Sequence, residues 1–284
     1  MFGLYSTLRY KDGPGSRADG VATLNQGYRN SLQLQSHMIG FFVPCYIDAL
    51  APQAAKASYN ILRRLGVEVE VVEKAVCCGM PLGDMGYASK VCHIESQSAE
   101  LLEKYSHIVV PSGICTDQFR NEFKAIPQTR EVTELKRHTY DIVEYLHDIL
   151  QITELPWHPR FPHRVALHVG CHALRYLHEA SPSELMEKEF SKLADLLNLV
   201  EGIEVCYAKR RDECCGFGGT FAIWDSPCSG LMGIDKVTDF MEEGLEYVVS
   251  GDCSCLLHQE GIARKNNIPL KAYHIAEILN GEAN

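Results

Sequence analysis

The chain has 284 residues, of which 46% are hydrophobic and 23% charged, a composition typical of a soluble globular protein with one large or two ordinary domains. Its 27 basic and 37 acidic side chains give a formal net charge of −10, which argues against nucleic-acid binding. No apolar run approaches the roughly 18–20 residues that a membrane span requires.

The first 37 residues are rich in glycine and polar side chains and show little periodicity, so we expect residues 1–37 to form a flexible N-terminal extension. The alternative is that this segment docks on the surface of the protein. It lacks the apolar stretch of roughly 7–15 residues that marks a secretory signal. We therefore expect a cytoplasmic protein, in which 12 cysteines indicate metal or redox chemistry rather than disulfides.

Strands and helices alternate in the next part of the chain, which we predict to be a first domain of residues 38–155. Short apolar runs predict strands, and longer segments ended by glycine or proline predict helices. The predicted strands are residues 39–44, 67–72, 107–111 and 137–140. The predicted helices are residues 49–65, 88–105, 116–123 and 141–150, with a loop at residues 74–86.

Three prolines follow, and because proline lacks a backbone donor and fixes φ, we predict a linker at residues 156–164. Residues 165–284 repeat the order of the first domain and are predicted to form a second one. Its predicted strands are residues 165–170, 203–207, 247–250 and 270–273. Its predicted helices are residues 182–199, 233–243 and 274–280.

The repeat extends to matching segments, since Phe42-Val43-Pro44-Cys45 corresponds to His168-Val169-Gly170-Cys171. Alternation of strands and helices implies parallel sheets joined by right-handed crossovers. We therefore predict an α/β fold of two duplicated Rossmann-like halves with parallel sheets. The repeated cysteines lie at the carboxyl ends of strands or in the loops that follow, where open α/β sheets build ligand sites.

Eight of the cysteines form two matched sets of four. Each set has a cysteine after the first strand of its half, an adjacent pair followed by glycine, and a cysteine after the third strand. The sets are Cys45, Cys77, Cys78 and Cys115, and Cys171, Cys214, Cys215 and Cys255. Thiolates are soft ligands, and four of them are enough for one [4Fe–4S] cluster or one tetrahedral zinc ion.

The adjacent pairs favour an iron–sulfur cluster over zinc. Neighbouring side chains on an extended chain point apart, so both reach one small ion only with backbone strain, whereas a cluster offers several irons. Gly79 and Gly216 follow the pairs and permit each loop to turn closely around such a site. A structural zinc at either site, and eight buried structural cysteines without metal, stay open as alternatives.

These residues resemble the cysteine-rich CCG domain family, and the resemblance covers the chain from Met38 to its end. The family includes the cysteine-rich component of heterodisulfide reductase, the glycolate oxidase iron–sulfur protein and the lactate-utilisation protein A group, and the last of these is the most similar. The motifs that carry the resemblance are Val43-Pro44-Cys45-Tyr46, Cys77-Cys78-Gly79-Met80-Pro81, Pro111-Ser112-Gly113-Ile114-Cys115, Cys171-His172-Ala173-Leu174-Arg175, Glu213-Cys214-Cys215-Gly216-Phe217-Gly218-Gly219-Thr220-Phe221 and His274-Ile275-Ala276-Glu277.

The resemblance implies an iron–sulfur redox subunit of a cytosolic system that oxidises L-lactate to pyruvate. Such a subunit of an oxidoreductase would carry or relay electrons together with B-type and C-type protein partners. One alternative is a CCG subunit of an oxidoreductase with another donor, namely glycolate, succinate or a heterodisulfide. The other is a non-catalytic scaffold, stapled by zinc, that assembles partner proteins.

The chain departs from the family pattern at the Cys-x-x-Cys motif, whose first cysteine is replaced by Ser112 in one half and by Asp252 in the other. The pattern of the members that use five cysteines for fused clusters is therefore incomplete here. Asp252 and the neighbouring Cys253 are candidate additional ligands, although a carboxylate is a harder donor than a thiolate.

Three further residues are candidates for contacts around the metal rather than for ligands. His172 follows Cys171 directly and could donate a hydrogen bond to a cluster sulfur, which tunes the potential of a cluster. The alternative is an ordinary, partly buried histidine with its own partner. Gly79 and Gly216 are expected to let each loop turn beside the metal. Close backbone approach at Phe217-Gly218-Gly219-Thr220 is expected to let amide groups hydrogen-bond to cluster sulfurs.

Overall fold

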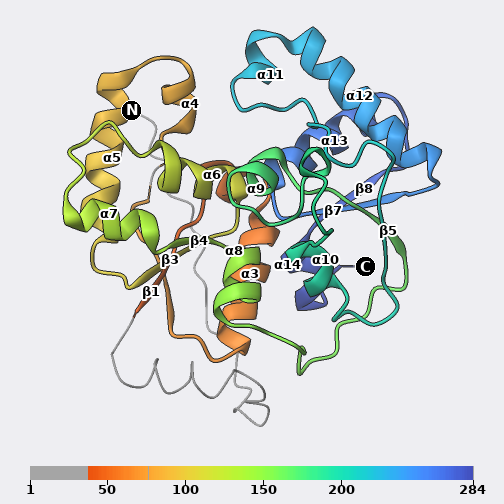
Figure 1. Ribbon diagram of the computed structural model, residues 1–284, viewed down its shortest axis with the longest axis horizontal. Helices are drawn as coiled ribbons and strands as arrows, with labels where there is room; N and C mark the ends of the chain where they lie inside the picture. Colours follow the sequence, from red (N-terminus) through yellow and green to blue (C-terminus); the bar gives the residue numbers. More distant parts are fainter. Residues whose placement is uncertain (1–37, 76, 284) are drawn as a thin grey trace.

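The computed structural model describes residues 38–75 and 77–283, and it confirms the predicted α/β fold (Figure 1). Its strands form two four-stranded sheets in which all the pairings are parallel. The strand orders are β2-β1-β3-β4 and β6-β5-β7-β8, so the second sheet repeats the first strand for strand. The extension predicted at residues 1–37 lies outside the described residues.

Each predicted strand is present, shortened by a residue or more in most cases. The strands are β1 (Ile39–Phe41), β2 (Val69–Val71), β3 (His107–Val110), β4 (Thr139–Asp141), β5 (Arg164–Leu167), β6 (Glu204–Cys206), β7 (Tyr247–Ser250) and β8 (Lys271–His274). Their continuous apolar runs are explained by burial on both faces, as Val109 in β3 and Val248 in β7 show.

Helices cover both sheets and supply most of the chain around the cysteines. The helices of the first half are α2 (Cys45–Leu50), α3 (Pro52–Arg64), α4 (Met80–Asp84), α5 (Ala88–Leu102), α6 (Gly113–Asp117), α7 (Arg130–Arg137) and α8 (Ile142–Glu144). Those of the second half are α9 (Cys171–Arg175), α10 (Lys192–Leu197), α11 (Phe221–Trp224), α12 (Ser226–Glu242), α13 (Cys253–Lys265) and α14 (Ile275–Asn280). Two π-helical turns extend α6 and α8, η1 (Gln118–Glu122) and η2 (Tyr145–Ile149), and one 3₁₀ turn is η3 (Ser183–Leu185).

The predicted helices differ from the structure at several places with identifiable causes. The segment predicted as one helix from residue 49 is two helices, because Ala51 precedes Pro52 and adopts φ −138° and ψ 49° outside the helical region. The helix predicted at residues 182–199 was wrong over its first half, where the 3₁₀ turn η3 ends at Met186, which adopts a left-handed conformation with φ 53°, and α10 begins only at Lys192. A short helix, α4, lies in the loop predicted at residues 74–86, and neither α7 nor α13 was predicted.

The two halves share one hydrophobic core. Helix α3 of the first half packs against α14 of the second, and the two lie side by side at the centre of Figure 1. The same cluster contains Phe41 and Ile61 from the first half and Leu167 and Leu279 from the second. The predicted linker joins this core, since the Trp157 Nε1 atom donates a hydrogen bond to the Leu279 carbonyl oxygen at 2.7 Å. Each half also has an apolar cluster of its own, so the boundaries proposed from the sequence separate two sheets and two smaller cores that a third, shared core joins.

The carboxyl ends of the two sheets meet near the middle of the molecule. Helix α6, which follows β3, packs against α9, which follows β5. This contact brings the cysteine-bearing segments of both halves to the same region. Among the helices that the structure describes, none combines the length and apolar character that crossing a membrane requires.

Candidate metal centre

The first set of four thiols converges at the carboxyl end of the first sheet. Cys45 begins α2, Cys77 and Cys78 lie in the loop before α4, and Cys115 lies within α6. The Sγ atoms of Cys45 and Cys77 are 3.8 Å apart, and those of Cys78 and Cys115 are 3.3 Å apart. The thiols of Cys77 and Cys78 also interact, so the four sulfur atoms form one connected group.

The second set converges in the same way. Cys171 begins α9, the pair of Cys214 and Cys215 lies in the loop before α11, and Cys255 lies in α13. Its thiols interact in the same order as in the first set. Cys214 interacts with Cys171 and Cys215, and Cys215 interacts with Cys255. The structure therefore brings together all eight cysteines predicted as ligands, four in each half, and their role as ligands remains a prediction.

The backbone conformation after each cysteine pair requires glycine. Gly79 and Gly216 have φ values of 94° and 90°, which other residues adopt only with strain. Their amides donate to the Sγ atoms of Cys77 and Cys214, each at 3.4 Å. A Cβ atom on Gly216 would lie 2.7 Å from both the Met232 Cβ atom and the Ser229 carbonyl oxygen. Backbone amides thus approach a sulfur atom in both loops. In the segment for which the sequence predicted such an approach, the Phe217 backbone also hydrogen-bonds to the Cys215 thiol.

One thiol in each set is strongly acidic. Hydrogen bonds from neighbouring thiols, above all from Cys45, lower the pKa of Cys77 to about 3. In the second set, hydrogen bonds from neighbouring thiols, above all from Cys171, lower the pKa of Cys214 to about 2. These hydrogen bonds, together with burial, raise the pKa of both donors. The neighbouring thiols therefore stabilise a thiolate at Cys77 and at Cys214, and ionisation of their donors Cys45 and Cys171 as well requires a cation among the sulfur atoms.

Four thiols can bind either a zinc ion or an iron–sulfur cluster, and the distances between their sulfur atoms help to distinguish the two. A tetrahedral zinc site with bonds of about 2.3 Å places its sulfur atoms about 3.8 Å apart. The spacing of 3.8 Å between the Cys45 and Cys77 sulfur atoms matches that value, and the spacing of 3.3 Å between those of Cys78 and Cys115 is shorter. A cluster attaches the thiolates to separate irons and needs them farther apart. Among the described residues, however, no three thiols of either set lie within 4.8 Å of one another, so neither set is arranged for a four-thiolate zinc ion, whereas a cluster accepts its thiolates on separate irons.

The two residues that replace cysteines form a bridge between the halves. Ser112 and Asp252 occupy equivalent positions as the N-caps of α6 and α13. The Tyr46 hydroxyl donates to Asp252 Oδ1 at 3.1 Å and lies 2.8 Å from Ser112 Oγ. Asp252 Oδ2 accepts from the backbone N–H of Ile114 in the other half at 2.8 Å. Both Asp252 oxygens are thus occupied by protein donors, which leaves the predicted role as a metal ligand without support.

Two other candidates have surroundings different from those predicted. Cys253 is 2% exposed and packs in the shared hydrophobic core. His172 directs Nδ1 to Asp117 Oδ2 of the first half, at 2.7 Å. Burial lowers the pKa of His172, but the hydrogen bond and the charge of Asp117 outweigh it, so the net pKa is raised. His172 therefore links α9 to α6 through Nδ1, and its hydrogen bond to a cluster sulfur stays a prediction.

The structure adds one residue that the sequence interpretation missed. His168 follows β5 and is 1% exposed, and one of its ring nitrogens lies within 4.8 Å of the Sγ atoms of Cys215 and Cys255. Burial lowers the pKa of His168 to about 3, so its ring is neutral and keeps a lone pair. The signal in the sequence is its place in the repeat, where the first half has Phe42.

The sequence profile of the CCG family, described as a cysteine-rich domain, matches residues 39–120 and 165–259. The chain belongs to the CCG family. The two matched segments contain the two sets of thiols, one in each segment. Each CCG segment also contains the first three strands of its sheet, so the family match and the structural repeat coincide.

Curated relatives match this CCG protein over most of its length. Lactate utilization protein A of Bacillus pumilus (strain SAFR-032) is 32% identical over 246 residues, which cover 85% of this chain and 98% of the relative. Lactate utilization protein A of Macrococcus caseolyticus (strain JCSC5402) is 32% identical over 251 residues, covering 86% and 96%. Among solved structures, a putative Asp/Glu racemase from Yersinia pestis matches 87% of this chain and 96% of the racemase chain. The TM-score of 0.37 and the sequence identity of 12% are too low to support an inference.

A cavity of about 490 Å³ lies between the two CCG halves. It is lined by residues that follow both cysteine pairs, together with one residue each from α6 and α9. These residues are Met80, Asp84, Ile114, His172, Gly218, Thr220, Phe221 and Trp224. The Thr220 hydroxyl donates to Asp84 Oδ2 at 3.5 Å across the cavity wall. The loops after the two pairs therefore face one shared space.

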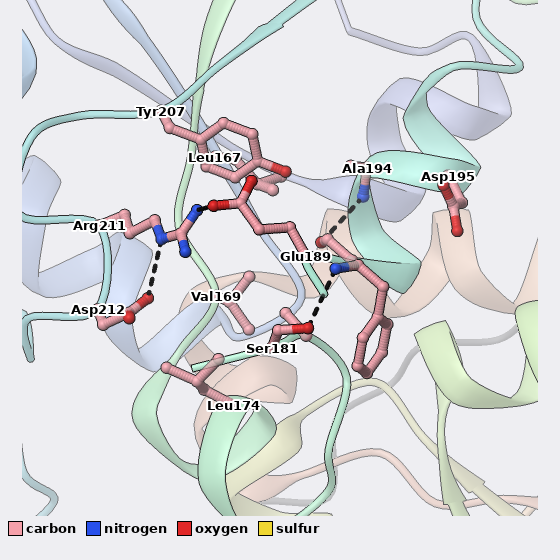
Figure 2. Close-up of a pocket in the computed structure, with 13 residues that line it drawn as sticks. Leu167, Val169, Leu174, Ser181, Glu189, Ala194, Asp195, Tyr207, Arg211 and Asp212 are labelled. Carbon is pink, nitrogen blue, oxygen red and sulfur yellow. Dashed lines mark hydrogen bonds and ion pairs between the residues drawn. The ribbon is translucent and has the colours of Figure 1, made fainter. Parts of the chain in front are cut away.

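A smaller pocket of about 260 Å³ lies within the second CCG half (Figure 2). Its wall combines apolar side chains, such as Val169 and Leu174, with Arg211. The Arg211 guanidinium pairs with Glu189 at 2.8 Å and with Asp212 at 3.8 Å, as Figure 2 shows. Its charge is therefore satisfied within the protein, and we assign no ligand to this pocket.

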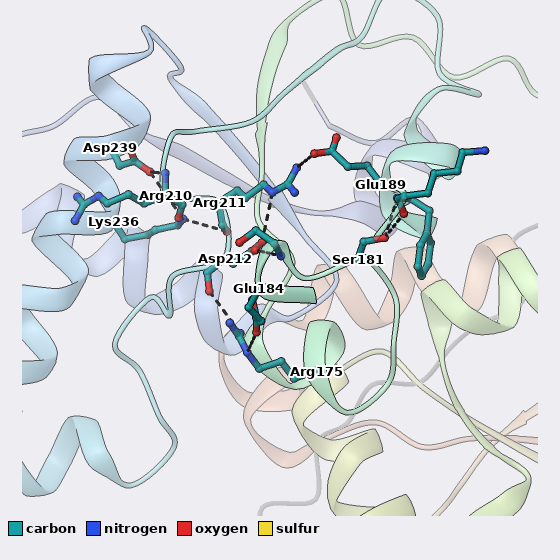
Figure 3. A network of polar contacts seen from close by, with 12 residues as sticks. Arg175, Ser181, Glu184, Glu189, Arg210, Arg211, Asp212, Lys236 and Asp239 are labelled. Carbon is teal, nitrogen blue, oxygen red and sulfur yellow. Dashed lines mark hydrogen bonds and ion pairs between the residues drawn. The ribbon is translucent and has the colours of Figure 1, made fainter. Parts of the chain in front are cut away.

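The backbone before the second cysteine pair is held by α12 (Figure 3). Lys236, whose side chain is 1% exposed, donates from Nζ to the carbonyl oxygens of Arg210 and Arg211 at 2.5 and 3.3 Å. Asp239, one turn further along α12, accepts from the Arg210 backbone N–H at 3.0 Å. Figure 3 shows these contacts on the side of the loop away from the pocket. They fix the approach of the chain to Cys214.

Proposed function

We propose that this chain is an iron–sulfur redox subunit of a cytosolic system that oxidises L-lactate to pyruvate, and that it carries or relays electrons there. The convergence of two matched sets of four thiols is the observation that carries the proposal. Relatives named Lactate utilization protein A, which match 85–86% of the chain at 32% identity, supply the metabolic context. We further propose that the subunit works with the B-type and C-type proteins of such a system.

The chain's own residues suit this role. When bound, an iron–sulfur cluster supplies one-electron transfer. Cys78 and Cys115 are buried whereas Cys45 is exposed, so the first site is shielded on one side and open to a partner on the other. In the second site, Cys215 and Cys255 are buried and Cys171 is half-buried. The amides of the glycines after each pair donate to sulfur, which stabilises thiolate charge.

A reconstituted turnover assay tests this function. The chain and its B-type and C-type partners are combined under anaerobic conditions with L-lactate, glycolate, succinate or a thiol–disulfide pair, and reduction of a dye is followed. We expect reduction that needs both L-lactate and this chain, that is lost with Cys214→Ser, and that persists with Cys92→Ser. Cys92 is exposed and lies outside both sets, so its replacement is the matched control. Turnover with another donor only, or without this chain, would overturn the proposal.

The spacing of 3.8 Å between the Cys45 and Cys77 sulfur atoms, which is that of two thiolates on one tetrahedral zinc ion, favours a second candidate function, a zinc-bound scaffold that assembles partner proteins. In that case Cys214→Ser would release zinc and dissociate the partners without changing any redox signal. Size-exclusion chromatography of the reconstituted mixture, with metal analysis of each fraction, separates the two functions. Dissociation with no redox signal in the parent protein supports the scaffold.

A further inference from the structure

His168 is a buried polar side chain without a partner. It is 1% exposed, and among the described residues neither Nδ1 nor Nε2 has a hydrogen-bond partner. Leaving a buried polar group unsatisfied costs about 1–3 kcal/mol, so native structures rarely keep one without a role. The unpaired ring nitrogens of His168 therefore indicate a partner other than a protein atom, such as a bound metal ion.

The position of the ring indicates what it meets. A ring nitrogen of His168 and the Sγ atoms of Cys215 and Cys255 all lie within 4.8 Å of one another. Three donors at such separations can bind one metal ion with bonds of about 2.0–2.3 Å. The aromatic ring of Phe240 meets the imidazole edge at 6.5 Å between centroids and offers no polar atom.

The first half differs at this position. Phe42 and His168 each directly follow the first strand of their half, and their backbone N–H groups donate to equivalent carbonyl oxygens, those of Val109 at 3.0 Å and Val249 at 2.9 Å. Phe42 fills its place with a ring that packs edge-on against Phe119, with centroids 5.0 Å apart. An apolar side chain in one half thus corresponds to an unsatisfied imidazole in the other.

We propose that His168 is a nitrogen ligand of the metal centre in the second half, so that the second site combines thiolates with an imidazole while the first has thiolates alone. This inference rests on the proposed function in one respect, namely that the second half binds a metal centre. It applies whether that centre is an iron–sulfur cluster or a zinc ion. The second half thus offers five donors, four thiols and the imidazole, and a centre with four protein ligands would use the imidazole in place of one thiolate. A neutral imidazole in place of a thiolate raises the reduction potential of an iron–sulfur centre, so the two sites would differ in potential.

The test uses the metal-loaded full chain, prepared anaerobically with histidine labelled selectively with ¹⁵N. If iron is bound, pulsed EPR of the reduced protein should show a ¹⁵N coupling of directly bound nitrogen. His168→Phe, which copies the first half, should lose that coupling and lower the potential of one centre. His258→Asn is the matched control, because His258 lies near the same loop but its Nε2 is 3.3 Å from the Ser229 carbonyl oxygen. It should keep the coupling.

If zinc is bound instead, X-ray absorption at the zinc edge should show nitrogen in the coordination shell of one site, lost in His168→Phe. Absence of directly bound nitrogen in the loaded wild-type protein overturns the inference, whichever metal is present, and this result does not depend on the folding of a variant. Protein that takes up neither iron nor zinc overturns the proposed function as well. Bound iron without nitrogen overturns only the role of His168.

Discussion

Replacing Asp252 by alanine should destabilise the protein far more than the loss of an ordinary helix cap. Asp252 is 4% exposed, and its carboxylate accepts from the Ile114 and Ser254 backbone N–H groups at 2.8 and 2.9 Å. It also accepts from the hydroxyls of Ser254 at 2.6 Å and Tyr46 at 3.1 Å. The substitution removes a cap, which costs about 1 kcal/mol, and leaves the Ile114 N–H buried without a partner, which costs about 1–3 kcal/mol. We expect a total loss of about 3 kcal/mol.

The assay is urea unfolding followed by circular dichroism, with each variant in the same metal-loaded state. Asp225→Ala is the matched control, because Asp225 caps α12 with one bond to the Cys228 N–H at 3.1 Å and is exposed. It should lose about 1 kcal/mol. Asp252→Asn keeps one acceptor oxygen and should fall between the two. If Asp252→Ala loses no more than Asp225→Ala, the bridge between the halves does not stabilise the protein as argued.

Three further predictions concern other parts of the molecule. Burial, then the charge of a neighbouring glutamate, raises the pKa of Glu179 from 4.5 to about 8. The folded state therefore binds a proton that the unfolded state releases, so melting temperature should fall as pH rises from about 4.5 to about 8, and Glu179→Gln should flatten this slope. Gly216→Ala should lower metal content because its Cβ would clash at 2.7 Å, whereas Gly230→Ala, with open space around it, should not. Lys236→Met removes the donor to the Arg211 carbonyl oxygen and leaves that of Arg210 with the Glu213 N–H alone, so it should cost about 1–3 kcal/mol in urea unfolding. An unchanged unfolding midpoint would contradict the argument that Lys236 holds the loop before Cys214.

Much of the fold could be predicted because its strands are short apolar runs in a repeated order. The sets of thiols could be predicted for the same reason, since a doublet such as Cys77-Cys78 occurs twice with matching flanking cysteines. Helix α13 was not predicted because its sequence is only weakly amphipathic, so it lacks the apolar periodicity that marks a helix. The turn at Met186 was missed because nothing local marks a left-handed conformation at a methionine.

The bridge and the imidazole ligand lay beyond local sequence patterns for a different reason. Tyr46 and Asp252 are 206 residues apart, so their contact depends on how the halves pack. That packing explains why Asp252 replaces a cysteine, since a carboxylate can reach the N–H of Ile114. A lone histidine such as His168 at the end of a strand is more often an ordinary core residue. Only its burial without a partner, beside two thiols, distinguishes it.

The measurement that tests the central claim most directly is iron and acid-labile sulfide analysis of anaerobically purified protein, combined with low-temperature EPR. The account predicts about four irons and an equal amount of sulfide for each occupied site, with a signal that appears on reduction. Cys214→Ser should lose the iron of the second site, and Cys92→Ser should lose none. Stoichiometric zinc without sulfide in the parent protein would contradict the claim that this chain is an iron–sulfur redox subunit.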